Sequence, residues 1–100
     1  MQCSPIIQQV ADSIRQRYPV EQIILYNEKH AVTGETTSFK LCLILDTRRP
    51  SEVERQLYLT IDCDIPFDLL IYTPAQWNRL KNCEGSFAWR IAQTGSVIDG

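Results

Sequence analysis

Two strand-like segments separated by a polar stretch constrain the fold of this chain most. The first strand is expected at about residues 22–26, where residues 23–26 are apolar on consecutive positions. The second is expected at about residues 38–46, where every second residue from Phe39 to Leu45 is apolar and falls on one face. Short runs of apolar and β-branched residues are typical of buried strands. The intervening segment, residues 27–37, is polar and contains Gly34, so we expect a loop there. The two strands, joined by a loop of this length, are predicted to pair antiparallel.

Helices are predicted on either side of these strands from their start and stop signals. Ser4-Pro5 begins a helix that ends before Pro19, because Ser favours the cap position and Pro the first helical position. A second helix is expected from Ser51 to about residue 62, because Ser51 and Glu54 form a capping-box pattern. It directs three apolar residues toward the core, namely Val53, Leu57 and Leu59.

The rest of the chain adds one more strand and two short helices. Residues 67–72 are apolar enough for a third strand, and a strand–helix–strand connection predicts that it lies parallel to the second. Thr73-Pro74 then begins a helix, and a last helix runs from Gly85 or Ser86 to Gln93. Residues 96–98 can add an edge strand. The prediction is one α+β or α/β domain over residues 1–100, with a mixed three- to four-stranded sheet covered by helices in the order α-β-β-α-β-α-α.

The segment LYNEKHAVTGETTSFKLCLIL resembles the nucleotidyltransferase domain of the DNA polymerase β superfamily. A common form of the family stretch is LFGSRARGxxxxxSDIDLLV. Without a gap, Asn27-Glu28 takes the place of Gly-Ser, Lys29 that of the first basic residue, and Ser38 that of the Ser before the carboxylates. The segments FDLLIYTPAQWNRL and SFAWRIAQTGSVIDG are similar to the family's third strand and closing helix, so the resemblance covers nearly the whole chain.

The resemblance implies a two-metal reaction in which three carboxylates hold Mg²⁺. Asp68 matches the third carboxylate, whereas Phe39 and Leu41 fall on the two aspartates of the second strand. Hydrocarbon side chains cannot ligate a metal, and one carboxylate cannot hold two dications. The degenerate nucleotide-binding positions are Asn27, Glu28, Lys29 and Ser38, and Glu28 places an anion where a phosphate would bind. Asp68 is the only retained candidate for a catalytic carboxylate, and we expect no metal site and no cofactor.

The leading hypothesis is a catalytically inactive domain that acts as a protein-interaction or regulatory module. Its partner would be another protein or a second copy, bound through an apolar face of Phe39 and Leu41. The open alternative is that the loop covers this face. The resemblance implies a HEPN-domain protein as one partner, because minimal nucleotidyltransferases are often paired with such proteins.

Two further hypotheses involve nucleotides. One is a divergent Mg²⁺-dependent nucleotidyltransferase that modifies a protein or a small molecule, and the other is nucleotide sensing without turnover. A relocated metal site would combine Asp68 with other carboxylates, namely Glu35, Asp46, Asp62 and Asp64.

Composition bounds the partners and the location. The net charge is −2, which gives no strong attraction to nucleic acid or to an anionic membrane. The N-terminus lacks the basic and apolar regions of a signal peptide, so we expect a cytoplasmic protein. The four cysteines lack C-x-x-C spacing, which favours free thiols over a disulfide or a metal cluster.

Overall fold

A long β-hairpin forms the centre of the structure. The computed structural model describes residues 4–98, in which β1 (Gln22–His30) and β2 (Thr36–Ile44) pair antiparallel along their whole lengths. The predicted antiparallel pairing is therefore confirmed, but the loop is much shorter than expected. Only residues 31–35 turn, with Gly34 at a φ of +96°. The polar residues that suggested a longer loop belong to a two-stranded extension of the sheet, where side chains need no apolar alternation because solvent reaches them.

The sheet has the strand order β3-β2-β1-β4. The β3 strand (Phe67–Tyr72) pairs parallel with β2, and the two-residue strand β4 (Ser96–Val97) pairs antiparallel with β1. The helix α2 (Pro50–Thr60) makes the crossover between β2 and β3. The mixed sheet, the central place of β2 and the short edge strand agree with the sequence prediction.

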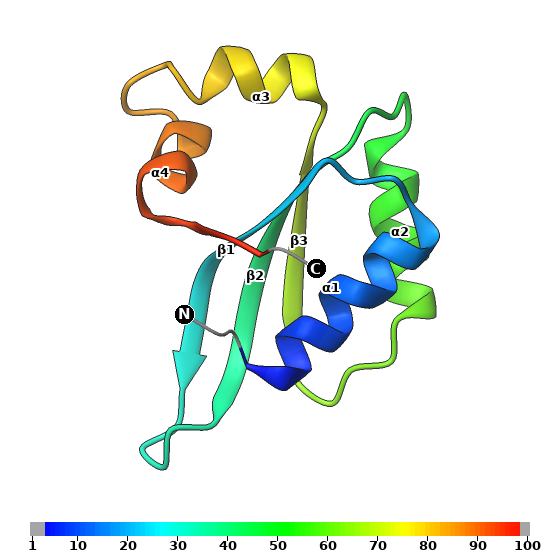
Figure 1. The fold of residues 1–100 in the computed structure, drawn as a ribbon, viewed down its shortest axis with the longest axis vertical. Coiled ribbons are helices and arrows are strands. Elements are labelled where there is room, and N and C mark those ends of the chain that lie inside the picture. The colour runs from blue at the N-terminus through cyan, green and yellow to red at the C-terminus, as the bar shows by residue number, and fades with distance from the viewer. Residues whose placement is uncertain (1–3, 99–100) are drawn as a thin grey trace.

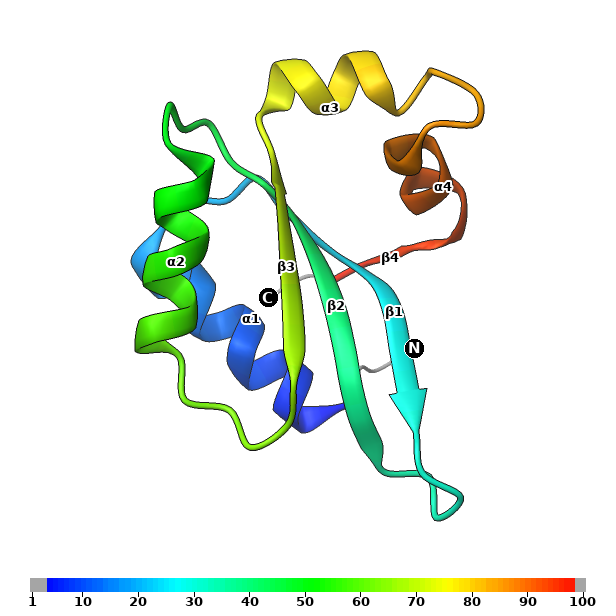
Figure 2. The ribbon, with the colours of Figure 1, turned by 180° about the vertical axis from the view of Figure 1, so that it is seen from behind.

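Helices lie on both sides of the sheet. The helices α1 (Pro5–Arg17) and α2 lie on one side, and α3 (Pro74–Leu80) and α4 (Phe87–Thr94) lie beyond the other, at the end far from the hairpin turn (Figures 1 and 2). Residues 4–98 thus form an α+β fold of four helices and a four-stranded mixed sheet. None of the helices in this range is long and apolar enough to cross a membrane.

The main core lies between the sheet and the helices α1 and α2. Phe39 and Leu41 are 1% and 0% exposed there, among buried residues of both helices that include Ile7, Val10, Ile14 and Leu57. The predicted interface of Phe39 and Leu41 is therefore wrong, because both side chains are inside the protein. The alternative that the loop covers them is also wrong, since helices cover this face. Alternate residues of a strand share one face, so both side chains pack with Leu43 and Leu45.

A second, smaller core lies on the opposite face of the sheet. It joins Ile24, Cys42 and Ile44 of the strands to residues of α3 and α4, namely Trp77, Ala88 and Ile91. The central strands are therefore apolar on both faces, as expected for buried strands. This core covers only the end of the sheet near α3 and α4. The remainder of this face carries the polar residues described below.

The helix ends test the capping patterns. The Thr73 hydroxyl accepts a hydrogen bond from the Gln76 N–H, and the Gln76 side chain accepts one from the Thr73 N–H, which completes a capping box at the predicted start of α3. The predicted cap at Ser51 is wrong, because α2 begins at Pro50 and Arg49 takes the cap position. Leu59, expected in the core, is exposed. It lies two residues from Leu57 on the helix, and residues two apart face different sides.

Candidate functional site

The register of the hairpin divides the predicted site residues between the two faces of the sheet. Asn27 lies opposite Lys40, and Lys29 lies opposite Ser38. Residues opposite each other in a sheet share a face. These four residues therefore lie on the face that α3 and α4 partly cover. Glu28 lies opposite Phe39, which places Glu28 on the other face, because the pairing shifts by one residue between Leu25 and Asn27.

Asp68 lies on the same face as Lys40. The two residues are neighbours in the parallel pairing of β2 and β3, and the Asp68 carboxylate is 3.9 Å from the Lys40 Nζ. Their side chains are 67% and 45% exposed, so this ion pair contributes little to stability. Phe39 and Leu41 point to the opposite face. Carboxylates at these two positions would therefore not lie beside Asp68. The β2 residues on the face of Asp68 are instead Ser38 and Lys40.

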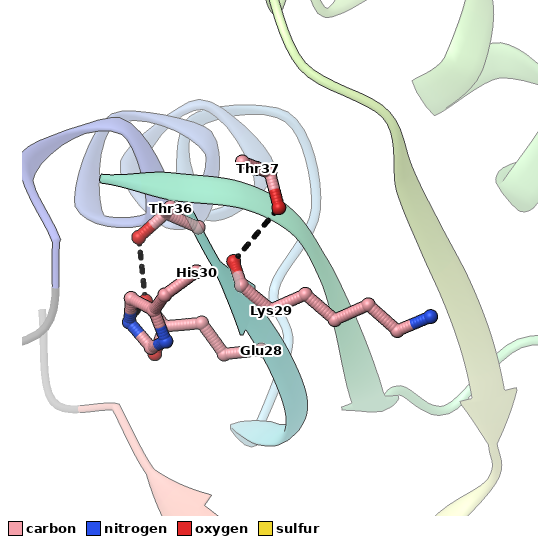
Figure 3. A network of polar contacts seen from close by, with 5 residues as sticks. All are labelled: Glu28, Lys29, His30, Thr36 and Thr37. Carbon is pink, nitrogen blue, oxygen red and sulfur yellow. Dashed lines mark hydrogen bonds and ion pairs between the residues drawn. The ribbon is translucent and has the colours of Figure 1, made fainter. Parts of the chain in front are cut away.

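Polar contacts hold Glu28 within the hairpin, on the face away from Asp68. The Thr36 hydroxyl donates to the Glu28 carboxylate at 2.6 Å, and the His30 Nε2 lies 3.0 Å from the same carboxylate oxygen. Figure 3 shows Lys29 pointing away from Glu28 and His30, while its backbone carbonyl accepts a hydrogen bond from the Thr37 hydroxyl at 3.2 Å. Glu28 is therefore a structural residue of the hairpin, and its carboxylate does not face the candidate site.

A small cavity adjoins these polar residues where α4 packs over β1. It has a volume of about 190 Å³ and is lined by Tyr26, Asn27, Lys40, Phe87, Arg90, Ile91 and Thr94. The rings of Tyr26 and Phe87 contact edge to face, with centroids 5.6 Å apart. We use the term open face for the surface formed by the following residues: Tyr26, Asn27, Lys29, Ser38, Lys40, Asp68, Phe87, Arg90 and Thr94. Sequence reasoning missed Tyr26, Phe87, Arg90 and Thr94, because nothing local shows that α4 returns to β1.

The hydroxyl of Tyr26 stays protonated across the neutral range. Burial, together with smaller contributions from nearby Cys42 and Asp68, raises its pKa to about 12. Burial also raises the pKa of the Cys42 thiol to about 12. Neither group is suited to act as a base or nucleophile near neutral pH, because its reactive anion is strongly disfavoured.

These raised pKa values predict a loss of stability at alkaline pH. The folded state holds both protons more tightly than the unfolded state does. The contribution of these two groups to the free energy of unfolding is therefore fully present below their unfolded pKa values of about 9 and 10, and it is lost as pH rises toward about 12. Urea unfolding of the native chain and of Tyr26→Phe across this range tests the prediction. The variant should lose less stability than the native chain, and an identical loss in both would contradict the role of Tyr26.

The carboxylates considered for a relocated metal site lie apart from Asp68. Asp62 and Asp64 line a cavity of about 470 Å³ beside α1, on the opposite side of the sheet. Glu35 lies in the hairpin turn, where its carboxylate accepts a hydrogen bond from the Thr33 hydroxyl at 3.0 Å. Asp46 follows β2 at the far end of that strand. Among residues 4–98, no group of three His, Cys, Asp or Glu side chains is placed to hold a metal ion.

The thiols that the structure describes are free: Cys42 is buried, Cys63 is half-buried and Cys83 is exposed. Cys3 lies outside the described residues.

Comparison of the chain with models of protein families, with curated proteins and with solved structures finds no match.

Proposed function

We propose that this chain is a nucleotidyltransferase-like domain that does not transfer nucleotides and that acts by binding a protein partner at the open face. The observation that carries the proposal is the Lys40 ammonium group beside the Asp68 carboxylate, at 3.9 Å. Asp68 is the residue that the resemblance assigns to metal binding. A positive charge beside this carboxylate disfavours the binding of a divalent cation there.

The charges of the open face disfavour two-metal chemistry. Two dications beside a triphosphate need several carboxylate oxygens, because Mg²⁺ prefers hard, anionic ligands. On the face of Asp68, β2 offers the Ser38 hydroxyl and the Lys40 ammonium. An ammonium group repels a dication by about 2 kcal/mol or more at 4 Å, even with the strong screening of water. One carboxylate paired with an ammonium group is a poor site for either metal ion.

The same face has the composition of a protein-binding surface. Tryptophan, tyrosine and arginine dominate the binding energy of protein interfaces, and aromatic residues including phenylalanine are enriched there. Tyr26, Phe87 and Arg90 meet around the cavity, and Phe87 is one of the large apolar side chains that remain exposed. A partner that covered Phe87 would remove apolar area from water. This supports binding at the open face in place of the buried pair Phe39 and Leu41.

An activity assay tests the absence of transfer. The purified chain would be incubated with each labelled nucleoside triphosphate, with Mg²⁺ or Mn²⁺, and with extracts as a source of acceptors. We expect no more incorporated label than with the Asp68→Ala variant. Incorporation that depends on metal and disappears in Asp68→Ala would overturn the proposal.

One observation favours the alternative of a divergent Mg²⁺-dependent nucleotidyltransferase. Glu28, which would repel a triphosphate, faces the other side of the sheet, while Asn27, Lys29 and Ser38 share the face of Asp68. A triphosphate would thus meet donors and cations at the open face. The same assay separates the two functions, because only the enzyme requires Asp68 for transfer.

A further inference from the structure

We infer that the partner presents an acidic segment to the open face, with one carboxylate bound in the cavity between Lys40 and Arg90. This inference rests on the proposed function, because it names the chemistry of the partner that the open face would bind. Lys40 and Arg90 come from different elements, β2 and α4, and line the same cavity. A carboxylate placed there can accept hydrogen bonds from both cations, and charge-assisted bonds of this kind are the stronger ones.

The charge of the open face differs in sign from that of the whole chain. The chain has a net charge of −2, yet this face brings together Lys29, Lys40 and Arg90 around the single carboxylate of Asp68. Clustered charge of one sign steers partners of the opposite sign and selects against others. Complementarity therefore favours an acidic partner at this face.

Of the two neutral polar residues that line the cavity, Asn27 offers donors that suit the same ligand. Asn27 carries a side-chain amide and Thr94 a hydroxyl, and both residues line the cavity beside the two cations. The Thr94 hydroxyl donates to the Arg90 carbonyl at 2.8 Å, so in this arrangement its free capacity is that of an acceptor. The Asn27 amide adds N–H donors, which a carboxylate can accept in addition to those of Lys40 and Arg90.

The volume of the cavity limits what can enter it. At about 190 Å³ it is smaller than the roughly 300–1,000 Å³ of typical small-molecule sites. A side-chain carboxylate on a short stem fits this size, and the rest of the partner would lie outside it. The exposed ring of Phe87, which contacts Tyr26 edge to face at 5.6 Å, offers an apolar surface at the cavity wall. A partner segment that alternates acidic and apolar residues would use both features.

Asp68 lets the inference predict the direction in which a substitution changes the affinity for an acidic ligand. Its carboxylate lies 3.9 Å from Lys40 and repels an incoming anion while it neutralises part of the cation's charge. Removing that charge with Asp68→Asn should therefore tighten the binding of an acidic ligand. A metal-dependent enzyme predicts the opposite effect, because there Asp68 would be a required ligand.

The probe is a short blocked peptide of alternating glutamate and leucine, titrated into the isotope-labelled chain and followed by nuclear magnetic resonance. The control peptide has glutamine in place of every glutamate. We expect saturable shifts of backbone amides at Asn27, Lys40, Phe87 and Arg90 with the acidic peptide only. The variant Lys40→Gln/Arg90→Gln should bind about tenfold more weakly or worse. Arg48→Gln, which removes an exposed charge outside the open face, should bind as the native chain does.

Three results of the peptide titrations would overturn the inference. They are an absence of shifts at the open face with millimolar peptide, equal shifts with the glutamine peptide, and weaker binding by Asp68→Asn. A further arm uses inorganic phosphate. Displacement of the peptide by phosphate at similar concentration would identify a site for free oxyanions, which also overturns an acidic protein segment as the ligand. None of these results changes the labelled-nucleotide assay, so failure of this inference and failure of the proposed function remain distinguishable.

Discussion

Replacing Phe39 with aspartate should unfold the chain. Phe39 is 1% exposed and stacks on Phe67 with ring centroids 5.6 Å apart. Truncating a buried phenylalanine typically costs about 3–5 kcal/mol, and a buried carboxylate adds several kcal/mol more. A domain of this size has roughly 5–15 kcal/mol of stability, so the variant should lose its cooperative unfolding transition. Circular dichroism with heating and with urea measures this directly.

The control for this prediction is Val32→Asp, which adds the same charge at the hairpin turn. Val32 is fully exposed, so the substitution should leave the transition within about 0.5 kcal/mol of the native value. If Phe39→Asp melted like the native chain, Phe39 would not belong to the core. The interface hypothesis for Phe39 and Leu41 would then regain its basis.

The double variant Ser38→Asp/Lys40→Asp should create a divalent-cation site in the folded chain. Both positions face the same side as Asp68, and Lys40 already neighbours it, so the variant brings three carboxylates to one patch of the sheet. Mn²⁺ should bind with a dissociation constant of about 1 mM or lower. Binding to the folded state alone also raises the melting temperature in proportion to the affinity and concentration of the ion. Calorimetry and thermal melts with Mn²⁺ measure both effects.

The matched control carries Asp68→Asn in addition to the two new aspartates. It should lose most of the Mn²⁺ affinity, because the third carboxylate is missing. Equal binding with and without Asp68 would show that the three side chains do not converge. The same conclusion would follow if the double variant folded but bound no Mn²⁺.

Most of the fold could be predicted because its signals are local. The period of two in residues 38–46, the Thr73-Pro74 start and the helical crossover each depend on neighbouring residues, and the structure agrees with them. The length of the hairpin could not be predicted in the same way. Residues 27–30 are polar because solvent reaches this part of β1, and a polar strand without a buried face looks like a loop in sequence.

The candidate site was predictable only in part. Asn27, Lys29, Ser38 and Asp68 do meet on one face, but Glu28, Phe39 and Leu41 lie on the other. The irregular pairing between Leu25 and Asn27 sets which residues of β1 share a face with which residues of β2, and such a shift leaves no mark in a single sequence.

Phe87 and Arg90 reach the site from α4 through a long-range packing arrangement. They lie about 60 residues beyond Tyr26 in the chain but line the same cavity. Helical spacing predicts which residues of α4 share a face, but it does not say which strand that face will contact. The contribution of Phe87 and Arg90 to the open face could therefore be identified only from the structure.

Calorimetric titration of the native chain with ATP, GTP, CTP and UTP, each with and without Mg²⁺, tests the central claim most directly. We propose that the Lys40 ammonium group, 3.9 Å from the Asp68 carboxylate, disfavours metal binding there and that the domain does not transfer nucleotides. The predicted result is no binding that depends on Mg²⁺ with any of the four nucleotides. Micromolar binding that requires Mg²⁺ would contradict the claim, because it would show a working metal site beside Asp68.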